Sequence, residues 1–113
     1  MKSRMDIANL MDRVFRACRD ARSEGQKEYA HNEDNGLANF ERVAERLGID
    51  RKKVLMTYAE KHLDGIHAHN NGLISQRESV RGRIRDVIVY MVLLWAMVDD
   101  DDSAADKKDG LPF

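Results

Sequence analysis

The chain has 113 residues, which is the length of a single small domain. Its 19 basic and 20 acidic residues leave a formal net charge of −1, so it lacks the net basic field of a general nucleic-acid-binding protein. Charged residues make up 35% of the chain, and the single proline is Pro112, a profile typical of long amphipathic helices. A local cluster of arginines can still hold a small anionic ligand.

The sequence also bears on the location of the protein. The single cysteine, Cys18, lies among apolar positions, so we expect a buried thiol and no internal disulfide. Residues 1–6 lack the apolar core of a secretion signal, which favours a cytoplasmic protein. The apolar run 87–98 is shorter than the about 20 residues that span a bilayer, so we expect no membrane partner.

A first helix is predicted from near Ser3 to about Tyr29. Ser3 and Asp6 form a helix-start signal, because a serine at the cap and an acid three residues later satisfy backbone N–H groups. Apolar residues then recur at helical spacing: Ile7, Leu10, Met11, Val14, Cys18 and Ala21. Residues 30–36 are rich in Asn, Asp and Gly and predict a polar loop.

Two further helices follow this loop. Residues 37–47 carry an apolar face, and Gly48 predicts the end of that helix. Asp50 is a favourable cap for the next helix, which we expect to reach about Asn70. Its buried stripe is predicted to comprise Val54, Leu55, Tyr58, Ala59, Leu63 and Ile66.

A fourth helix is predicted to begin with a capping box formed by Ser75 and Glu78. Apolar residues then alternate in steps of four and three, as in a coiled-coil seam: Val80, Ile84, Val87, Met91, Leu94 and Val98. Three large apolar residues fall outside this seam and require a second packing surface: Ile88, Leu93 and Trp95. A partner subunit is the simplest such surface, so we expect at least a homodimer.

Four consecutive aspartates, Asp99 to Asp102, follow the apolar run. They repel one another and oppose the helix dipole, so we expect them to end the helix. The sequence therefore predicts one all-helical domain, residues 1–98, and an acidic disordered tail, residues 99–113. The fold class is all-α, a bundle of four to five helices that oligomerisation completes.

Two carboxylate pairs are candidates for chemistry. Glu60 and Asp64 are four residues apart and share a helix face, and Glu78 and Asp86 lie on the fourth helix. Two helices that present such pairs to one crevice could hold Mg²⁺, which prefers oxygen ligands and can bridge phosphate oxygens. The alternative is that these acids are solvated or ion-paired.

Basic and aromatic residues suggest an anionic ligand. Arg77, Arg81 and Arg85 repeat every four residues and form one stripe, whose mutual repulsion an anion would offset. The alternative is pairing with neighbouring acids. Tyr29 and Asn39 flank the polar loop, where a ring can stack on a base and an amide can bond a base or ribose.

Two histidines, His62 and His69, lie seven residues apart on one face of the third predicted helix, with Ile66 between them. We interpret them as residues at an interface or at the edge of the core. A metal-binding role is less favoured, because no matching pair of ligands is evident in the sequence.

The order of several short motifs resembles a known family. The motifs are Glu28-Tyr29, Asn39-Phe40, Lys61-His62-x-Asp64-x-Ile66, Glu78-Ser79-Val80 and Asp86-x-x-x-Tyr90. Together they resemble the phage-associated nucleotide modification associated domain, which is similar to the all-α, MazG-like nucleoside triphosphate pyrophosphohydrolases. The resemblance covers about residues 28–97, and it would put the protein in the host cytoplasm if a phage encodes it.

The resemblance implies a helical fold that pairs subunits around a nucleotide, and Mg²⁺-dependent hydrolysis that releases pyrophosphate. Carried over to this chain, it implies metal ligands at Glu60, Asp64, Glu78 and Asp86. It implies catalytic roles for Glu78, Asp86 and Lys61, with Lys61 and an arginine such as Arg81 at the phosphates.

The chain departs from the family pattern at three places. The paired Glu-x-x-Glu of the enzymes is absent from the third predicted helix, and Gly82 stands where an acidic residue is common. Ala30 replaces the glycine that usually follows the tyrosine. A second hypothesis is therefore sequestration of a nucleotide without hydrolysis. The chain also resembles phage anti-defence proteins of the Thoeris type, helical oligomers that bind cyclic ADP-ribose signals. A third hypothesis is a protein-binding helical oligomer whose charges are only surface.

Overall fold

The computed structural model describes residues 1–29 and 34–109, with side chains described for 1–25 and 34–105. These residues form four helices and no strand: α1 (Arg4–Tyr29), α2 (Ala38–Leu47), α3 (Arg51–Asn70) and α4 (Val80–Asp109). The predicted all-α fold is confirmed.

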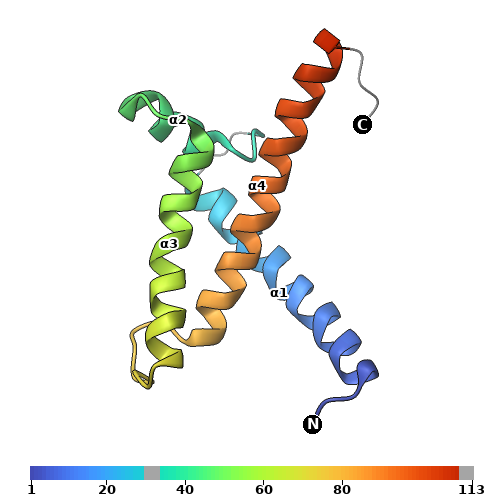
Figure 1. Ribbon diagram of the computed structural model, residues 1–113, viewed down its shortest axis with the longest axis vertical. Helices are drawn as coiled ribbons and strands as arrows, with labels where there is room; N and C mark the ends of the chain where they lie inside the picture. The colour runs from blue at the N-terminus through green and yellow to red at the C-terminus, as the bar shows by residue number, and fades with distance from the viewer. Residues whose placement is uncertain (30–33, 110–113) are drawn as a thin grey trace.

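The helices are arranged around a hairpin of α3 and α4. These two run in opposite directions and are joined by residues 71–79, while α2 packs on α3 (Figure 1). Helix α1 crosses α4, and its N-terminal half extends away to one side (Figure 1). The radius of gyration is 16.7 Å, against about 13 Å for a compact chain of this length, so the molecule is open.

Local caps define the predicted ends of the first three helices. The Ser3 hydroxyl accepts from the Asp6 N–H at 3.1 Å, and the Asp6 carboxylate accepts from the Ser3 N–H at 2.9 Å. Gly48 ends α2 in the left-handed region at φ 68°. The Asp50 carboxylate accepts from the Lys52 N–H at 2.7 Å and caps α3.

The predicted start of the fourth helix is wrong. Helix α4 begins at Val80, and its capping residue is Ser79, whose hydroxyl accepts from the Gly82 N–H at 3.0 Å. The segment before α4 is irregular, and the Gln76 side chain holds it by hydrogen bonds to backbone carbonyls outside α4. Its amide donates to the carbonyls of Gly65 at 2.9 Å and Leu73 at 3.1 Å, which ties the segment to the end of α3.

The predicted end of the fourth helix is also wrong, because α4 continues through the aspartates to Asp109. The start of α3 supplies positive charge beside them. Lys52 Nζ donates to an Asp101 carboxylate oxygen at 2.5 Å, and Arg51 lies 3.3 Å from Asp101 and 3.6 Å from Asp100. These cations offset the repulsion that was expected to stop the helix.

The core lies where α2, α3 and the middle of α4 meet. It is built from Leu37, Phe40, Ala44, Val54, Leu55, Leu93 and Met97. The predicted seam of α4 is wrong, because its members Ile84, Met91 and Val98 are exposed, whereas Leu93, predicted to lie outside the seam, is buried. Cys18 is buried where α1 crosses α4, as predicted.

Candidate functional site

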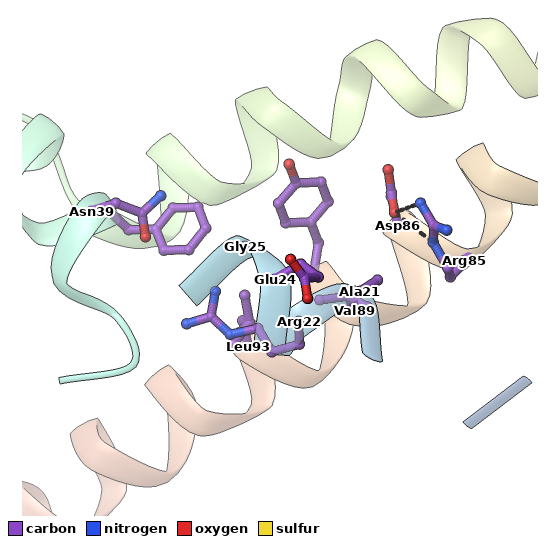
Figure 2. A pocket seen from close by; sticks show the side chains of 11 residues that line it. Ala21, Arg22, Glu24, Gly25, Asn39, Arg85, Asp86, Val89 and Leu93 are labelled. Atoms are coloured by element: carbon purple, nitrogen blue, oxygen red, sulfur yellow. Dashed lines mark hydrogen bonds and ion pairs between the residues drawn. The ribbon is translucent and has the colours of Figure 1, made fainter. Parts of the chain in front are cut away.

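A cavity of about 410 Å³ lies between the second half of α1, the start of α2 and the middle of α4 (Figure 2). Its apolar lining comes from Phe40, Val89, Leu93 and the ring of Tyr90. Its polar lining comprises Arg22, Glu24, Asn39, Arg85 and Asp86. The cavity therefore combines aromatic walls with two guanidinium groups, two carboxylates and an amide.

Packing of α2 explains why Asn39 reaches this cavity. Phe40 is 2% exposed and contacts the rings of Tyr58 and Tyr90, with centroids 5.8 Å and 6.3 Å away. This contact fixes the rotation of α2 about its axis. The neighbouring Asn39 is half-buried and lines the cavity.

The two arginines of the cavity are held by local contacts. Arg85 binds the carboxylate of Asp86 through Nε at 3.0 Å and Nη2 at 2.9 Å (Figure 2). Arg22 donates from Nη2 to the Gly36 carbonyl at the end of the polar loop. Burial lowers the pKa of the Arg22 guanidinium, because removing a cation from water disfavours its charged form. An anion would compensate that loss of hydration.

His62 lies between two predicted site residues, Glu78 and Asp86. It is 7% exposed, and its Nδ1 lies 3.6 Å from Glu78 while its Nε2 lies 3.7 Å from Asp86. Both separations are slightly longer than a hydrogen bond. Its ring packs on Tyr90 at 5.8 Å between centroids. The prediction that His62 lies at the edge of the core is confirmed, but its place between the two acids was not predicted.

Arg83 places a cation beside Glu78. Its Nη1 lies 3.2 Å from Glu78, and its Nε donates to the Gln76 side chain at 2.9 Å. The side chain crosses α3 at Gly65, where an added Cβ would stand 2.3 Å from Arg83 Nε. A glycine is therefore needed at this point for the arginine to reach its partners.

The structure brings together only part of the predicted site. Asn39, Arg85 and Asp86 line the cavity, whereas Glu78 does not and lies on the other side of His62 from Asp86. The other predicted residues of α3 are exposed and do not line the cavity: Glu60, Lys61 and Asp64. Arg77 is exposed before α4, and the side chain of Tyr29 lies outside the described residues.

The predicted arginine stripe divides between two cavities. Arg81 lines a second cavity of about 490 Å³, at the start of α4, together with Arg13 of α1 and with Arg85. Leu10, Val14 and Ile84 form part of its apolar lining. Arg85 lies at the boundary and lines both cavities, whereas Asn39 lines only the first.

Sequence reasoning missed Arg22 and the contacts of His62. Arg22 is four residues after Cys18, so it continues the apolar face of α1 with a charged residue. His62 follows Leu55 and Ala59 on the buried stripe of α3. A charged or polar residue on a buried stripe was the signal in both cases, because such a residue needs a partner.

Among the residues with described side chains, no group of three or more His, Cys, Asp or Glu residues is arranged to hold a metal ion. Glu78 and Asp86 are instead engaged with His62 and two arginines. A requirement for Mg²⁺ stays a prediction. In the described part of the chain, no helix combines the length and apolar character that a membrane span requires.

Comparisons with known proteins found no match to the chain among family models, curated proteins or solved structures. The resemblance to the phage nucleotide modification associated domain therefore rests on the motifs of the sequence.

Proposed function

We propose that this protein binds a nucleotide-derived small molecule in the cavity of about 410 Å³ between α1, α2 and α4. The observation that carries the proposal is that Asn39 and Arg85 line one cavity with the rings of Phe40 and Tyr90. The volume is within the about 300–1,000 Å³ of ordinary small-molecule sites, and a few polar groups on an apolar wall are typical of them.

Each part of the lining has a complementary part in a nucleotide. A base would contact the half-buried Tyr90 rather than Phe40, which is 2% exposed. The Asn39 amide can both donate to and accept from a base edge or ribose. Arg22 and Arg85 would contact phosphate oxygens, to which guanidinium groups donate strong hydrogen bonds. Arg85 would do so through Nη1, because its Nε and Nη2 bind Asp86. Glu24 can accept from a ribose hydroxyl or a base amino group.

The contacts favour the hypothesis that the protein sequesters a nucleotide without hydrolysing it. Asp86 is bound by Arg85, and Glu78 lies in contact with Arg83, so both carboxylates are already neutralised by cations. A metal ion at these acids would have to displace the arginines. Pyrophosphohydrolysis through Glu78, Asp86 and Lys61 with Mg²⁺ stays the predicted reaction if the ligand is turned over.

The first experiment is mass spectrometry of small molecules released from the purified protein, followed by thermal melting with nucleoside triphosphates, ADP-ribose and cyclic ADP-ribose. A ligand at one hundred times its dissociation constant stabilises the fold by about 2.7 kcal/mol. The melts are repeated with Mg²⁺, and pyrophosphate release is measured in parallel. Binding with intact ligand supports sequestration, and pyrophosphate above background supports the enzyme.

Two variants locate the ligand. Asn39→Ala alters only the proposed cavity, and Arg81→Ala alters only the second cavity at the start of α4. We expect Asn39→Ala to weaken binding about tenfold, which is about 1.4 kcal/mol for one lost hydrogen bond. The matched Arg81→Ala should bind as the parent does. The reverse result would move the ligand to the second cavity.

The remaining parts of the proposal concern assembly and location. We infer a homo-oligomer of at least two chains, because large apolar side chains of α4 remain exposed. A cytoplasmic location, in the host if a phage encodes the chain, belongs to the same proposal. If no nucleotide shifts melting and a protein co-purifies, the third hypothesis of a protein-binding oligomer replaces it.

A further inference from the structure

One face of α4 is apolar and exposed. Ile84, Ile88, Met91, Trp95 and Val98 succeed one another in steps of four and three, and all but the half-buried Ile88 are exposed. Trp95 is 72% exposed, and the neighbouring Val92 is 60% exposed. This spacing places them on one side of the helix, as in a coiled-coil seam. It shares Ile84, Met91 and Val98 with the seam that the sequence predicted, and it adds Ile88 and Trp95.

A groove of about 1,190 Å³ runs beside this face, between α1 and α4. Its apolar lining includes Phe15 from α1, Leu37 from the start of α2, and Ile88, Val92 and Leu93 from α4. Phe15 is 50% exposed. The N-terminal half of α1 extends away from α4 (Figure 1). The groove and the exposed face of α4 therefore form one continuous apolar surface.

We propose that a second copy of this chain occupies this surface in a two-fold dimer, with the same α1–α4 surface on both subunits. The open shape of the chain supports such a dimer. A radius of gyration of 16.7 Å, about 4 Å above the compact value, comes with an N-terminal half of α1 whose apolar face is exposed. Such a face needs a partner, and a second copy carries the matching α4.

The available area agrees with a dimer. Phe15 and Trp95 alone offer roughly 250–300 Å² of aromatic surface, taking about 200–250 Å² for each whole side chain. This is about one third of the roughly 800 Å² that each partner buries in a standard interface. The exposed Val92, Met91 and Met11 extend the same surface.

The charge of the groove permits self-association. Its charged lining consists of two cations, Arg19 and Arg22, and two anions, Asp34 and Asp100. A surface of one sign would repel its own copy across a two-fold axis, whereas this balanced rim does not.

The dimer would also complete the candidate site. Arg22, Val89 and Leu93 line both the groove and the proposed ligand cavity, so the two spaces adjoin. A partner in the groove would add a wall beside the ligand. This added wall rests on the proposed ligand site, whereas the dimer surface is argued without a ligand.

The test is sedimentation equilibrium without nucleotide, combined with fluorescence of Trp95, the single tryptophan of the chain. At micromolar concentration the parent protein should have twice the 13.0 kDa mass of one chain. Dilution should restore the monomer mass and shift the emission to the red, because Trp95 then returns to water. A monomeric mass at all concentrations, or emission that does not change as the mass falls, would overturn the proposal.

Val92→Glu places a charge on the proposed interface at an exposed position, so each chain should keep its helicity and become monomeric. Ile74→Glu is the matched control, since Ile74 is 76% exposed in the segment before α4 and lies outside the groove. The control should keep the dimer mass. A dimer that survives Val92→Glu would contradict the assigned surface, and ligand melts on both variants test the nucleotide proposal separately.

Discussion

Replacing Gly65 by alanine tests how the α3–α4 hairpin is held beside the candidate site. An alanine Cβ would lie 2.3 Å from Nε and 2.4 Å from Cδ of Arg83, so the arginine must move away. It would then lose the bond from Nε to Gln76 and the contact with Glu78. Alanine in place of an exposed helical glycine normally stabilises a helix, so the expected sign here is the reverse of the usual one.

The free energy lost with the Arg83 contacts is larger than the free energy gained from the helix propensity of alanine. The hydrogen bond from the charged Arg83 to Gln76 is worth about 1.5–3 kcal/mol, and the half-exposed pair with Glu78 about 0.2–1 kcal/mol. The higher helix propensity of alanine, relative to glycine, stabilises the helix by about 0.8–1 kcal/mol. We therefore expect Gly65→Ala to destabilise the protein by about 1–3 kcal/mol.

Urea unfolding followed by circular dichroism measures this difference, at one fixed protein concentration because association would shift the midpoint. The same substitution in an Arg83→Ala background should stabilise by about 0.8–1 kcal/mol, since only helix propensity remains there. A Gly65→Ala change that stabilises both backgrounds equally would refute the close approach of Arg83.

Three further predictions concern the helix ends and the buried thiol. Ser79→Ala should cost about 1 kcal/mol in urea unfolding and Ser75→Ala much less, because only Ser79 caps α4; equal costs would contradict this start. The hydrogen bond from Lys52 lowers the pKa of Asp101. The stabilisation that this bond gives the folded protein is therefore present above the pKa of an unfolded aspartate, about 3.9. It is lost as the pH falls through the lower pKa of Asp101 in the folded protein. Asp101→Asn should flatten the acid side of a pH titration of helicity, and an unchanged titration would remove this pair as the cause. Burial raises the pKa of Cys18, so alkylation at pH 8 should be much slower in the native protein than in urea; equal rates would show an accessible thiolate.

The prediction of the first three helices succeeded because their ends depend on neighbouring residues. Ser3 and Asp6 bond each other, Asp50 caps the helix that follows it directly, and Gly48 needs only its own left-handed backbone. Such signals lie within a few residues of one another, so one sequence without relatives contains them.

The candidate site was predictable only in part. The motifs selected Asn39, Arg85 and Asp86, which do line one cavity. They could not exclude Arg81, because a stripe along one helix does not say which neighbouring helix faces each turn. Helix α1 crosses α4 near Cys18, and this crossing separates the cavity of Arg81 from that of Asn39.

Both ends of α4 depended on residues distant in the sequence. The capping box at Ser75 is sound by local rules, but Gln76 bonds to the Gly65 carbonyl and keeps the segment irregular. The aspartates repel one another by local rules, yet Lys52 and Arg51 of α3 lie beside them and the helix continues. Helix type and the first three boundaries thus follow from short-range patterns in this chain. The extent of α4, the rotation of its apolar face and the partners of its charges follow from packing, because contacts between distant segments outweigh local preferences of about 1 kcal/mol.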